Sequence, residues 1–313
     1  MDYSVIVTTY NFDYNKLFET LYSIIIQKNC TFEIIISDDG SREFNSKRII
    51  DFFEKNNFTN YKILDNKINV GTVMNINKAI EIAVGKLVKL ISPGDLLYEE
   101  NVLEKAYNYM VKNNYSIIFG KAIYYSINDQ KDITFYNMRN PLDLNPYINY
   151  NLKKIKKANL FYKDLILGAA FVSNKELFKR YLKKIIDIVK YNEDLSCILM
   201  LMDDIRIEYW DEYLIWYEYG TGISTSSDRG FEKKLYEDKK KFFYIFGQEY
   251  HELMKIYKIF YGKFQKFHII SKLRRKFKRK FSERKIKKLS ECDINDNKIK
   301  LIKLLENTDV KGE

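Results

Sequence analysis

The stretch IIISDDGS at residues 34–41 is a short apolar run that ends in two carboxylates, a glycine and a serine. A β-branched run of this length is typical of a buried strand, and Asp, Gly and Ser favour the turn that follows one. Upstream, VIVTTYN at residues 5–11 has the same form, with hydroxyl and amide side chains after the apolar run. Parallel strands carry such groups at one edge of a sheet, beyond their carboxyl ends, where ligands bind.

Strand and helix patterns alternate outward from these two runs. Strands are predicted at residues 4–8, 32–37, 61–64 and 86–91, and helices at residues 14–28, 46–56 and 72–84. This β-α-β-α-β-α-β order predicts a parallel sheet with right-handed crossovers. The last of these strands ends in SPGD at residues 92–95, so three polar turns are expected to converge on one binding edge.

The rest of the chain is less regular. Helices are predicted at residues 99–113, 174–190 and 230–266, strands at 115–127, 133–136 and 168–173, an irregular stretch near 140–150, and a helix that opens at 191–194. We therefore predict a catalytic domain over residues 1–229 and a helical C-terminal extension over residues 230–313.

The basic segment at residues 272–288 carries almost all of the formal net charge of +11, so the remainder of the chain is close to neutral. A neutral body argues against a nucleic-acid partner, because phosphate binding needs charge spread over the binding face. On a helix, the apolar residues of this region form a narrow stripe within a cationic surface: Leu273, Phe277, Phe281, Ile286 and Leu289. The pattern favours an anionic membrane surface. A solvated or disordered tail, or RNA binding by the tail, are the alternatives.

Histidine and cysteine are too few to carry chemistry. The chain has two histidines, both late and among lysines, and three widely spaced cysteines without a CxxC motif. Ser-His-Asp and Cys-His catalysis and zinc binding therefore lack their residues. Carboxylates are left for any acid, base or metal role.

In this order and spacing, the motifs resemble family 2 glycosyltransferases of the GT-A fold, over about residues 1–225. VIVTTYN is similar to that family's first strand and turn, IIISDDGS to its nucleobase-binding strand end, and NVG at residues 69–71 precedes a helix as in the family. The resemblance implies an α/β fold with a Rossmann-like, mixed nucleotide-binding sheet flanked by helices, followed here by a helical, basic extension.

By this resemblance Thr8 and Asp39 contact the base of a nucleotide-sugar donor. A carboxylate accepts a hydrogen bond from uracil N3–H, which selects a UDP-sugar, because an unpaired buried group is costly. The implied donor set also contains Tyr10, Asn69, Gly71, Ser92 and Gly94. From the residues alone, Asp38 and Asp39 could instead form a turn that caps the next helix.

The metal motif departs from the family pattern. Many relatives have Asp-x-Asp-Asp where this chain has SPGD, so Asp95 is the carboxylate that remains and Gly94 replaces a side chain that can contact the ribose. One carboxylate with diphosphate oxygens and water can still hold Mn²⁺ or Mg²⁺. The alternative is a Pro-Gly turn in which Asp95 caps a helix.

The pair Glu193-Asp194 resembles the family's Glu-Asp pair. Its Asp acts there as the general base of an inverting transfer, since a single displacement needs a base on the acceptor hydroxyl. Asp194 is therefore the predicted base, with Glu193 as its support or substitute. Acidic residues that stabilise a helix N-terminus are the structural alternative.

The implied activity is transfer of one sugar to a saccharide acceptor. The basic segment and the resemblance point to a lipid-linked saccharide of lipopolysaccharide or capsule synthesis, and to a cytoplasmic enzyme peripheral on the inner face of the membrane. YEYGTGIST at residues 217–225 is expected to form a mobile loop over the donor. A retired relative that only binds nucleotide or glycan is the alternative. A dehydrogenase or a nucleotidyltransferase is disfavoured, because neither kind of glycine-rich loop is present.

Overall fold

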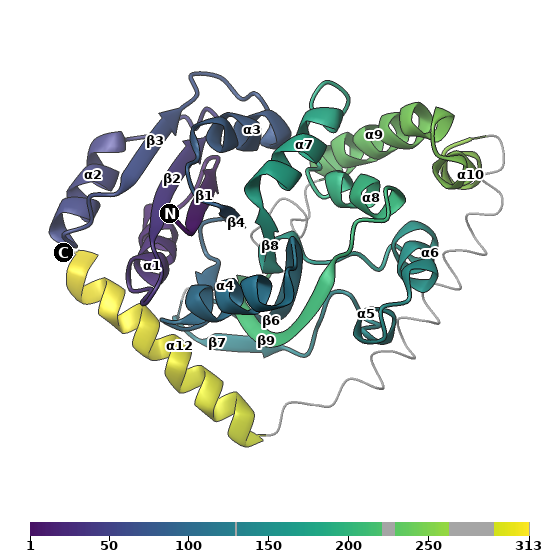
Figure 1. Ribbon diagram of the computed structural model, residues 1–313. Coiled ribbons are helices and arrows are strands. Elements are labelled where there is room, and N and C mark those ends of the chain that lie inside the picture. The colour runs from purple at the N-terminus through teal and green to yellow at the C-terminus, as the bar shows by residue number, and fades with distance from the viewer. Residues whose placement is uncertain (129, 221–228, 263–290, 313) are drawn as a thin grey trace.

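The computed structural model in Figure 1 describes residues 1–128, 130–220, 229–262 and 291–312. Within these ranges nine strands form one mixed sheet of order β3-β2-β1-β4-β8-β6-β9-β5, with β7 paired to β6. The strands are β1 Tyr3–Thr9, β2 Phe32–Asp38, β3 Tyr61–Asp65, β4 Leu87–Ile91, β5 Leu96–Leu97, β6 Ile117–Ile127, β7 Ile133–Tyr136, β8 Phe171–Asn174 and β9 Glu208–Glu218. The α-helices are α1 Tyr14–Ile25, α2 Ser46–Lys55, α3 Thr72–Ile82, α4 Val102–Asn113, α5 Asn145–Ile148, α6 Leu152–Tyr162, α7 Lys175–Ile185, α8 Leu195–Met202, α9 Arg229–Ile245, α10 His251–Phe260 and α12 Glu291–Gly312.

The first four long strands form the predicted parallel sheet. β1 pairs in parallel with β2 and β4, and β2 pairs in parallel with β3. Alternate residues of β1 and β2 face opposite sides: Val5 and Ile34 pack with α1 and α2, while Ile6 and Ile35 pack with α3 and α7. This period of two is what a strand covered by helices on both faces requires.

Beyond β4 the sheet changes direction. β8 runs antiparallel to β4, β6 antiparallel to β8, β9 parallel to β6, and β5 antiparallel to β9. The expected mixed sheet flanked by helices is confirmed. β9 and α6 are elements for which the sequence patterns made no prediction.

The single helix predicted over residues 230–266 is wrong. α9 ends at Ile245, a 3₁₀ turn follows at Phe246–Gln248, and α10 begins at His251. Gly247 explains the reversal, because a Cβ there would lie 3.0 Å from backbone atoms of Met254 and would hold the two helices apart.

α9 and α10 share a hydrophobic core with the sheet. Phe242, Phe246 and Leu253 belong to the same buried cluster as Phe178 and Leu199. The domain boundary at residue 229 stays a prediction, and the basic segment 272–288 lies outside the described residues. In the described ranges, each helix is too short or too polar to cross a bilayer.

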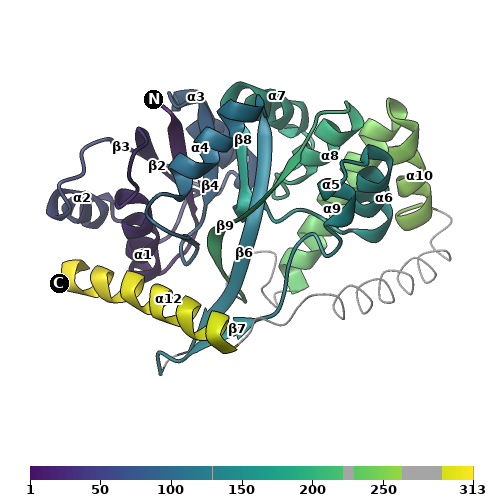
Figure 2. The same cartoon turned by 60° about the horizontal axis from the view of Figure 1, so that its bottom comes forward.

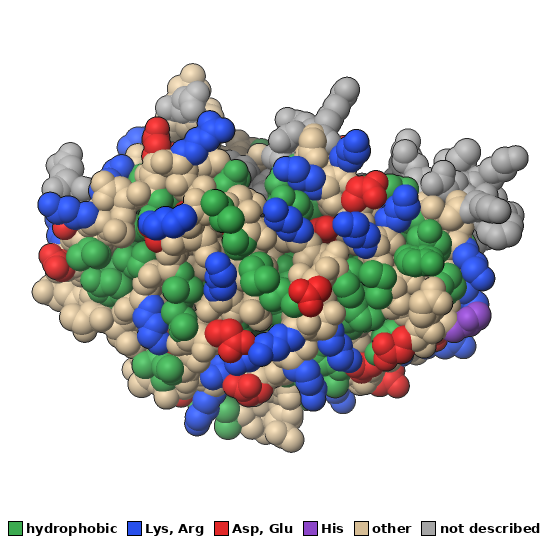
Figure 3. All heavy atoms as spheres, turned by 90° about the horizontal axis from the view of Figure 1, so that it is seen from above, with side chains coloured by type: hydrophobic (Ala, Val, Ile, Leu, Met, Phe, Trp, Pro, Cys, Tyr) green, Lys and Arg blue, Asp and Glu red, His purple; other side chains and the backbone are tan. Residues whose placement is uncertain are grey.

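The charges of the body are mixed. On the face in Figure 3, Lys and Arg side chains are interspersed with Asp, Glu and apolar side chains. This face does not form the broad basic surface that a nucleic-acid duplex needs.

The C-terminal helix α12 returns to the first half of the chain. It lies beside α1, as Figures 1 and 2 show. Leu301 is fully buried in a cluster with Leu96 and Trp216, and the Tyr98 hydroxyl donates to Asn297 Oδ1 at 3.2 Å. α12 therefore contributes to a hydrophobic core together with β5, β6 and β9.

We expect Leu301→Ala to lower the free energy of unfolding by about 2–4 kcal/mol, because it leaves a cavity in this cluster. Ile299→Ala on the same helix is the matched control, since Ile299 is 52% exposed, and it should change stability little. Denaturant unfolding of both variants measures the difference. Equal, small effects would mean that α12 does not pack here in solution.

Candidate functional site

The carboxyl ends of β1 and β4 meet as predicted. Thr8 Oγ1 lies 3.2 Å from Ser92 Oγ, and both hydroxyls line a cavity. Tyr10 follows β1 and is 44% exposed. The predicted donor-side residues of two separate strands are thus brought together.

Asp38 is a structural residue. Its fully buried carboxylate accepts from Thr9 Oγ1 at 2.8 Å, from Ser41 Oγ at 2.6 Å and from Ser41 N–H at 2.7 Å. It does not cap α2, whose N-cap is Asn45. Asp38 instead ties the end of β1 to the turn after β2.

Asp39 holds the loop that contains Asn69 and Gly71. Its carboxylate accepts from Val70 N–H at 2.7 Å and from Gly71 N–H at 3.0 Å. Burial raises the pKa of Asp39, although these two N–H donors act in the opposite direction. Gly71 has φ 93°, and a Cβ there would lie 2.3 Å from the Lys190 side chain, so glycine is required at this corner.

Residues 92–95 form a tight turn, with Asp95 N–H donating to Ser92 O at 3.0 Å. Asp95 does not cap a helix. Its buried carboxylate accepts from Glu218 N–H in β9 at 3.1 Å, and Glu218 in turn pairs with Lys16 at 2.6 Å. Gly94 has φ 94°, and a Cβ there would lie 2.1 Å from Glu218 Oε2, so a side chain at this position would displace the Glu218 carboxylate.

Lys89 is a fully buried cation beneath this turn. Its Nζ donates to Leu90 O at 2.8 Å and to Ala169 O. Burial lowers the pKa of Lys89 to about 7, opposed by the charge of Asp95. Burial likewise raises the pKa of Asp95 to about 7, opposed by Glu218 N–H and Lys89. Within LVKLI the lysine interrupts an apolar strand, and that interruption is the signal that could have identified it.

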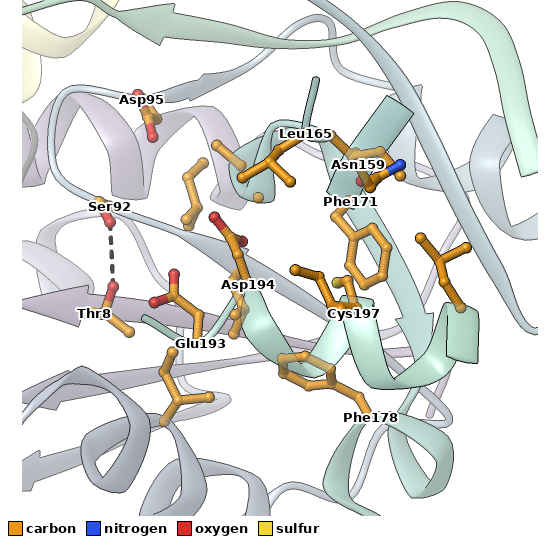
Figure 4. Close-up of a pocket in the computed structure, with 18 residues that line it drawn as sticks. Thr8, Ser92, Asp95, Asn159, Leu165, Phe171, Phe178, Glu193, Asp194 and Cys197 are labelled. Atoms are coloured by element: carbon orange, nitrogen blue, oxygen red, sulfur yellow. Dashed lines mark hydrogen bonds between the residues drawn. The ribbon is translucent and has the colours of Figure 1, made fainter. Parts of the chain in front are cut away.

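Glu193 and Asp194 lie together in a cavity of about 80 Å³ that Thr8, Ser92 and Asp95 also line. Figure 4 shows both carboxylates pointing into this space, Glu193 toward Thr8. Asp194 occupies the N-cap position of α8, yet its side chain makes no capping hydrogen bond. The pair thus lies at the N-terminus of α8, as the structural alternative expects, while the Asp194 carboxylate faces the cavity.

Burial raises the pKa of both carboxylates. The charge of Asp194 raises the pKa of Glu193 further, while Lys239 of α9 acts to lower that of Asp194. Lys239 thus favours the ionised form of Asp194, and the charge of Asp194 favours the protonated form of Glu193.

Three supporting residues have no motif of their own. Asp238 of α9 accepts from Tyr191 N–H at 2.7 Å and from Lys190 N–H at 3.2 Å, which anchors the segment that leads into the carboxylate pair. Lys239 is the next residue, and Gly168 lies against Asp194. In the sequence Asp238 and Lys239 are part of a charged helix, and such residues are usually solvated. Asp203 is the C-cap of α8.

Comparison with known proteins identifies the family. A model described as glycosyl transferase family 2 matches residues 4–185, more than half of the chain. The chain belongs to glycosyl transferase family 2. The matched range contains β1 to β4 and the site residues up to Asp95, while Glu193 and Asp194 lie just beyond it.

Relatives of this family 2 chain include two uncharacterized glycosyltransferases. That of Methanocaldococcus jannaschii is 28% identical over 217 residues, which cover 68% of this chain and 69% of the relative. That of Rickettsia conorii is 32% identical over 127 residues, 41% of this chain and only 20% of the relative's length.

Solved structures of S. aureus TarS share the fold. The complex of TarS residues 1–349 with UDP-GlcNAc has a TM-score of 0.55 at 19% identity and covers 90% of this chain and 79% of TarS 1–349. The UDP complex has a TM-score of 0.52 at 19% identity, with 83% of this chain and 72% of the other covered. The predicted GT-A fold is confirmed, and the roles of the individual site residues stay predictions.

The position of Gly168 can be tested through stability alone. A Cβ there would lie 2.6 Å from Asp194 Oδ1, so Gly168→Ala should cost about 1–3 kcal/mol of unfolding free energy through crowding. In an Asp194→Ala background this contact is absent, and the cost should largely disappear. The same loss in both backgrounds would show that Gly168 is constrained by something other than Asp194.

Proposed function

We propose that the chain is an inverting glycosyltransferase that moves a sugar from a UDP-sugar to a hydroxyl of a saccharide acceptor. The observation that carries this proposal is the uncapped Asp194 carboxylate in a cavity at the carboxyl edge of the sheet, beside Thr8, Ser92 and Asp95. A base is thereby positioned where nucleotides bind in sheets of this kind.

A nucleotide-sugar donor is supported by family membership and by the UDP and UDP-GlcNAc complexes of TarS. The hydrogen bonds of the Asp39 carboxylate favour uracil as the base of the donor nucleotide. A carboxylate has about four acceptor positions, and three are engaged by Val70 and Gly71 N–H, which leaves capacity on Oδ2 for uracil N3–H. The cavity of about 80 Å³ is too small for a nucleotide sugar. The nucleotide would therefore lie outside it, along Thr8, Asp39 and Ser92.

The residues present fit a divalent ion. Asp95 supplies a hard oxygen ligand in the cavity wall, and the Glu218 N–H fixes the orientation of its carboxylate. Mn²⁺ or Mg²⁺ held there with donor diphosphate oxygens would neutralise the charge that develops on the leaving group.

The reaction needs a single displacement. Asp194 takes the proton of the acceptor hydroxyl while the hydroxyl oxygen forms a bond to the anomeric carbon of the donor sugar. The bond from that carbon to the diphosphate breaks at the same time, and UDP is released. Asp194 is the proposed base because Lys239 favours its ionised form, while the charge of Asp194 favours a protonated Glu193 that does not compete for the proton.

Asp194→Asn should lower sugar transfer by about 10²–10⁴-fold, the scale of lost general-base help, with nearly unchanged UDP binding. Glu193→Gln is the matched control and should keep most of the turnover. Transfer by the wild type should also rise with pH through an acidic limb above the ordinary aspartate pKa of about 4, because burial raises the pKa of the base. Near-normal transfer by Asp194→Asn would exclude this assignment. Absence of any donor turnover by the wild type would favour the retired relative.

The metal assignment is tested by calorimetry with UDP. UDP affinity should fall strongly when a chelator replaces Mn²⁺, because buried Asp95 would then face the diphosphate as a like charge. In Asp95→Asn the dependence on Mn²⁺ should be lost. Affinity that is indifferent to the chelator in the wild type would contradict a metal at Asp95.

A lipid-linked acceptor of lipopolysaccharide or capsule synthesis, and a peripheral position on the inner face of the cell membrane, belong to the proposal. They are supported by the net charge of the segment 272–288 and by its apolar stripe. Each Lys or Arg near an anionic surface contributes on the order of 1 kcal/mol.

The membrane test should preserve α12, because Leu301 is part of the core. We expect neutralisation of the lysines and arginines at 272–288 by glutamine to abolish sedimentation with phosphatidylserine vesicles at low salt, while UDP binding stays unchanged. Binding by the wild type should weaken as salt is raised, since charges are screened beyond a Debye length of about 8 Å at physiological ionic strength. Equal sedimentation of both proteins would assign the segment another role.

A further inference from the structure

A second hollow, the β6–β9 groove, has a volume of about 980 Å³ and lies outside the catalytic cavity. Its walls come from Phe119–Ile123 of β6, 208–213 of β9, the segment 136–141 and α5. Figure 2 shows β6 next to its parallel partner β9, with α5 beside them. The volume lies at the upper end of the range of about 300–1,000 Å³ for ligand sites.

The sheet is irregular where β6 lines the groove. The parallel pairing of β6 with β9 shifts register between Phe119 and Lys121 and again between Lys121 and Ala122. Gly120 lies at the shift, where a Cβ would stand 2.8 Å from Leu214 Cβ. Irregularities of this kind redirect side chains and are frequent beside binding sites.

Aromatic rings with polar edges dominate the lining. Tyr115, Tyr136, Tyr209 and Tyr213 are partly exposed, and Trp210 lies in the wall. Tyr209 OH donates to Asp211 Oδ1 at 2.6 Å, and Tyr136 OH lies 2.9 Å from Ser126 Oγ. Flat apolar faces with hydrogen-bonding rims suit a ligand that has both C–H faces and hydroxyl groups.

The groove is lined by three cations, Lys121, Arg139 and Arg206, and by three carboxylates, Glu208, Asp211 and Glu212, so its formal charge is balanced. Arg206 pairs with Glu208 and lies 4.2 Å above the Tyr150 ring, and Lys121 pairs with Asp211 at 3.2 Å. A polyanion would have to compete with these carboxylates. An uncharged, hydroxyl-rich chain can instead hydrogen-bond to the paired groups without separating them.

The groove and the catalytic cavity share a wall. Tyr147 lines the groove, and its hydroxyl accepts from Nδ2 of Asn159, which lines the cavity, at 2.8 Å. Phe119 of the groove is the strand partner of Phe171 of the cavity. The two hollows are therefore neighbours that meet at these side chains.

We propose that the β6–β9 groove binds an uncharged oligosaccharide, namely the part of the acceptor chain remote from its reacting hydroxyl. The proposal rests on the glycosyltransferase function proposed above and specifies the acceptor as a saccharide chain of several units.

The test uses the full chain on an array of neutral oligosaccharides of graded length, with heparin and inorganic polyphosphate as anionic probes. Neutral chains should bind, and better with length. Calorimetry with the best array ligand should show about tenfold weaker binding by Tyr209→Ala and by Arg206→Ala, the scale of one lost aromatic or charge-assisted contact. Arg206 is exposed, so its variant tests the groove even if Tyr209→Ala fails to fold.

Matched controls separate the groove from general effects. Tyr244→Ala removes a tyrosine that is 51% exposed on α9 and should leave glycan affinity unchanged. Trp216→Phe leaves Trp210 as the remaining indole of a chain with two tryptophans, so its fluorescence should respond when the groove fills.

Three results would each overturn the proposal: the wild type binds no neutral oligosaccharide, both groove variants keep the wild-type affinity, or the wild type prefers heparin or polyphosphate to neutral chains. The proposed function fails separately. Groove variants should still release UDP from the donor, and Asp194→Asn should still bind the oligosaccharide.

Discussion

The Asp38 carboxylate is the contact on which the donor side of the site depends. It lies at the end of β2 and satisfies the Thr9 hydroxyl of β1 together with the N–H and hydroxyl of Ser41. An unpaired buried donor costs about 1–3 kcal/mol, so this junction strongly favours one position of β1 relative to the turn. Asp39 is the next residue, so the same junction also fixes the position of the Asp39 backbone. The Asp39 carboxylate accepts hydrogen bonds from Val70 N–H and Gly71 N–H, and it thereby positions the loop before α3.

The second half of the site depends on the C-terminal helices. Asp238 anchors the backbone that leads into Glu193, and Lys239 biases the protonation of Asp194. Both residues lie beyond the range that the family model matches. The parallel strands therefore supply the proposed donor edge, whereas α8 and α9 together set the position and charge of the proposed base.

Much of this could be predicted from the sequence where a pattern is local. The apolar runs and polar turns at residues 5–11 and 34–41 identified the parallel strands and their shared edge, and Asp194 was identified from its resemblance to a family motif. β9 was not predicted, because its exposed and buried residues do not alternate along an irregular strand. Lys89 and Asp238 were not predicted either, since their partners lie far away in the chain and charged residues are usually exposed. Glu218 was predicted in a mobile loop at residues 217–225, which is wrong for this residue, because it is buried at the end of β9; residues 221–225 lie outside the described residues.

The distant partners Glu218 and Lys89 also bear on the proposed metal motif SPGD, in which Asp95 is the remaining carboxylate. Asp95 and Glu218 are two buried carboxyl groups, and Lys89 and Lys16 are the two amines beside them, so these four groups carry no net formal charge whether the proton lies on Asp95 or on Lys89. A divalent ion alone would add two uncompensated positive charges to a buried region, which is unfavourable. A diphosphate alone would bring negative charge toward Asp95. Arriving together, ion and diphosphate preserve the balance, and binding of each should therefore strengthen binding of the other. On the proposed assignment, a motif with one carboxylate would suffice under this condition, because the donor would bring the remaining oxygen ligands.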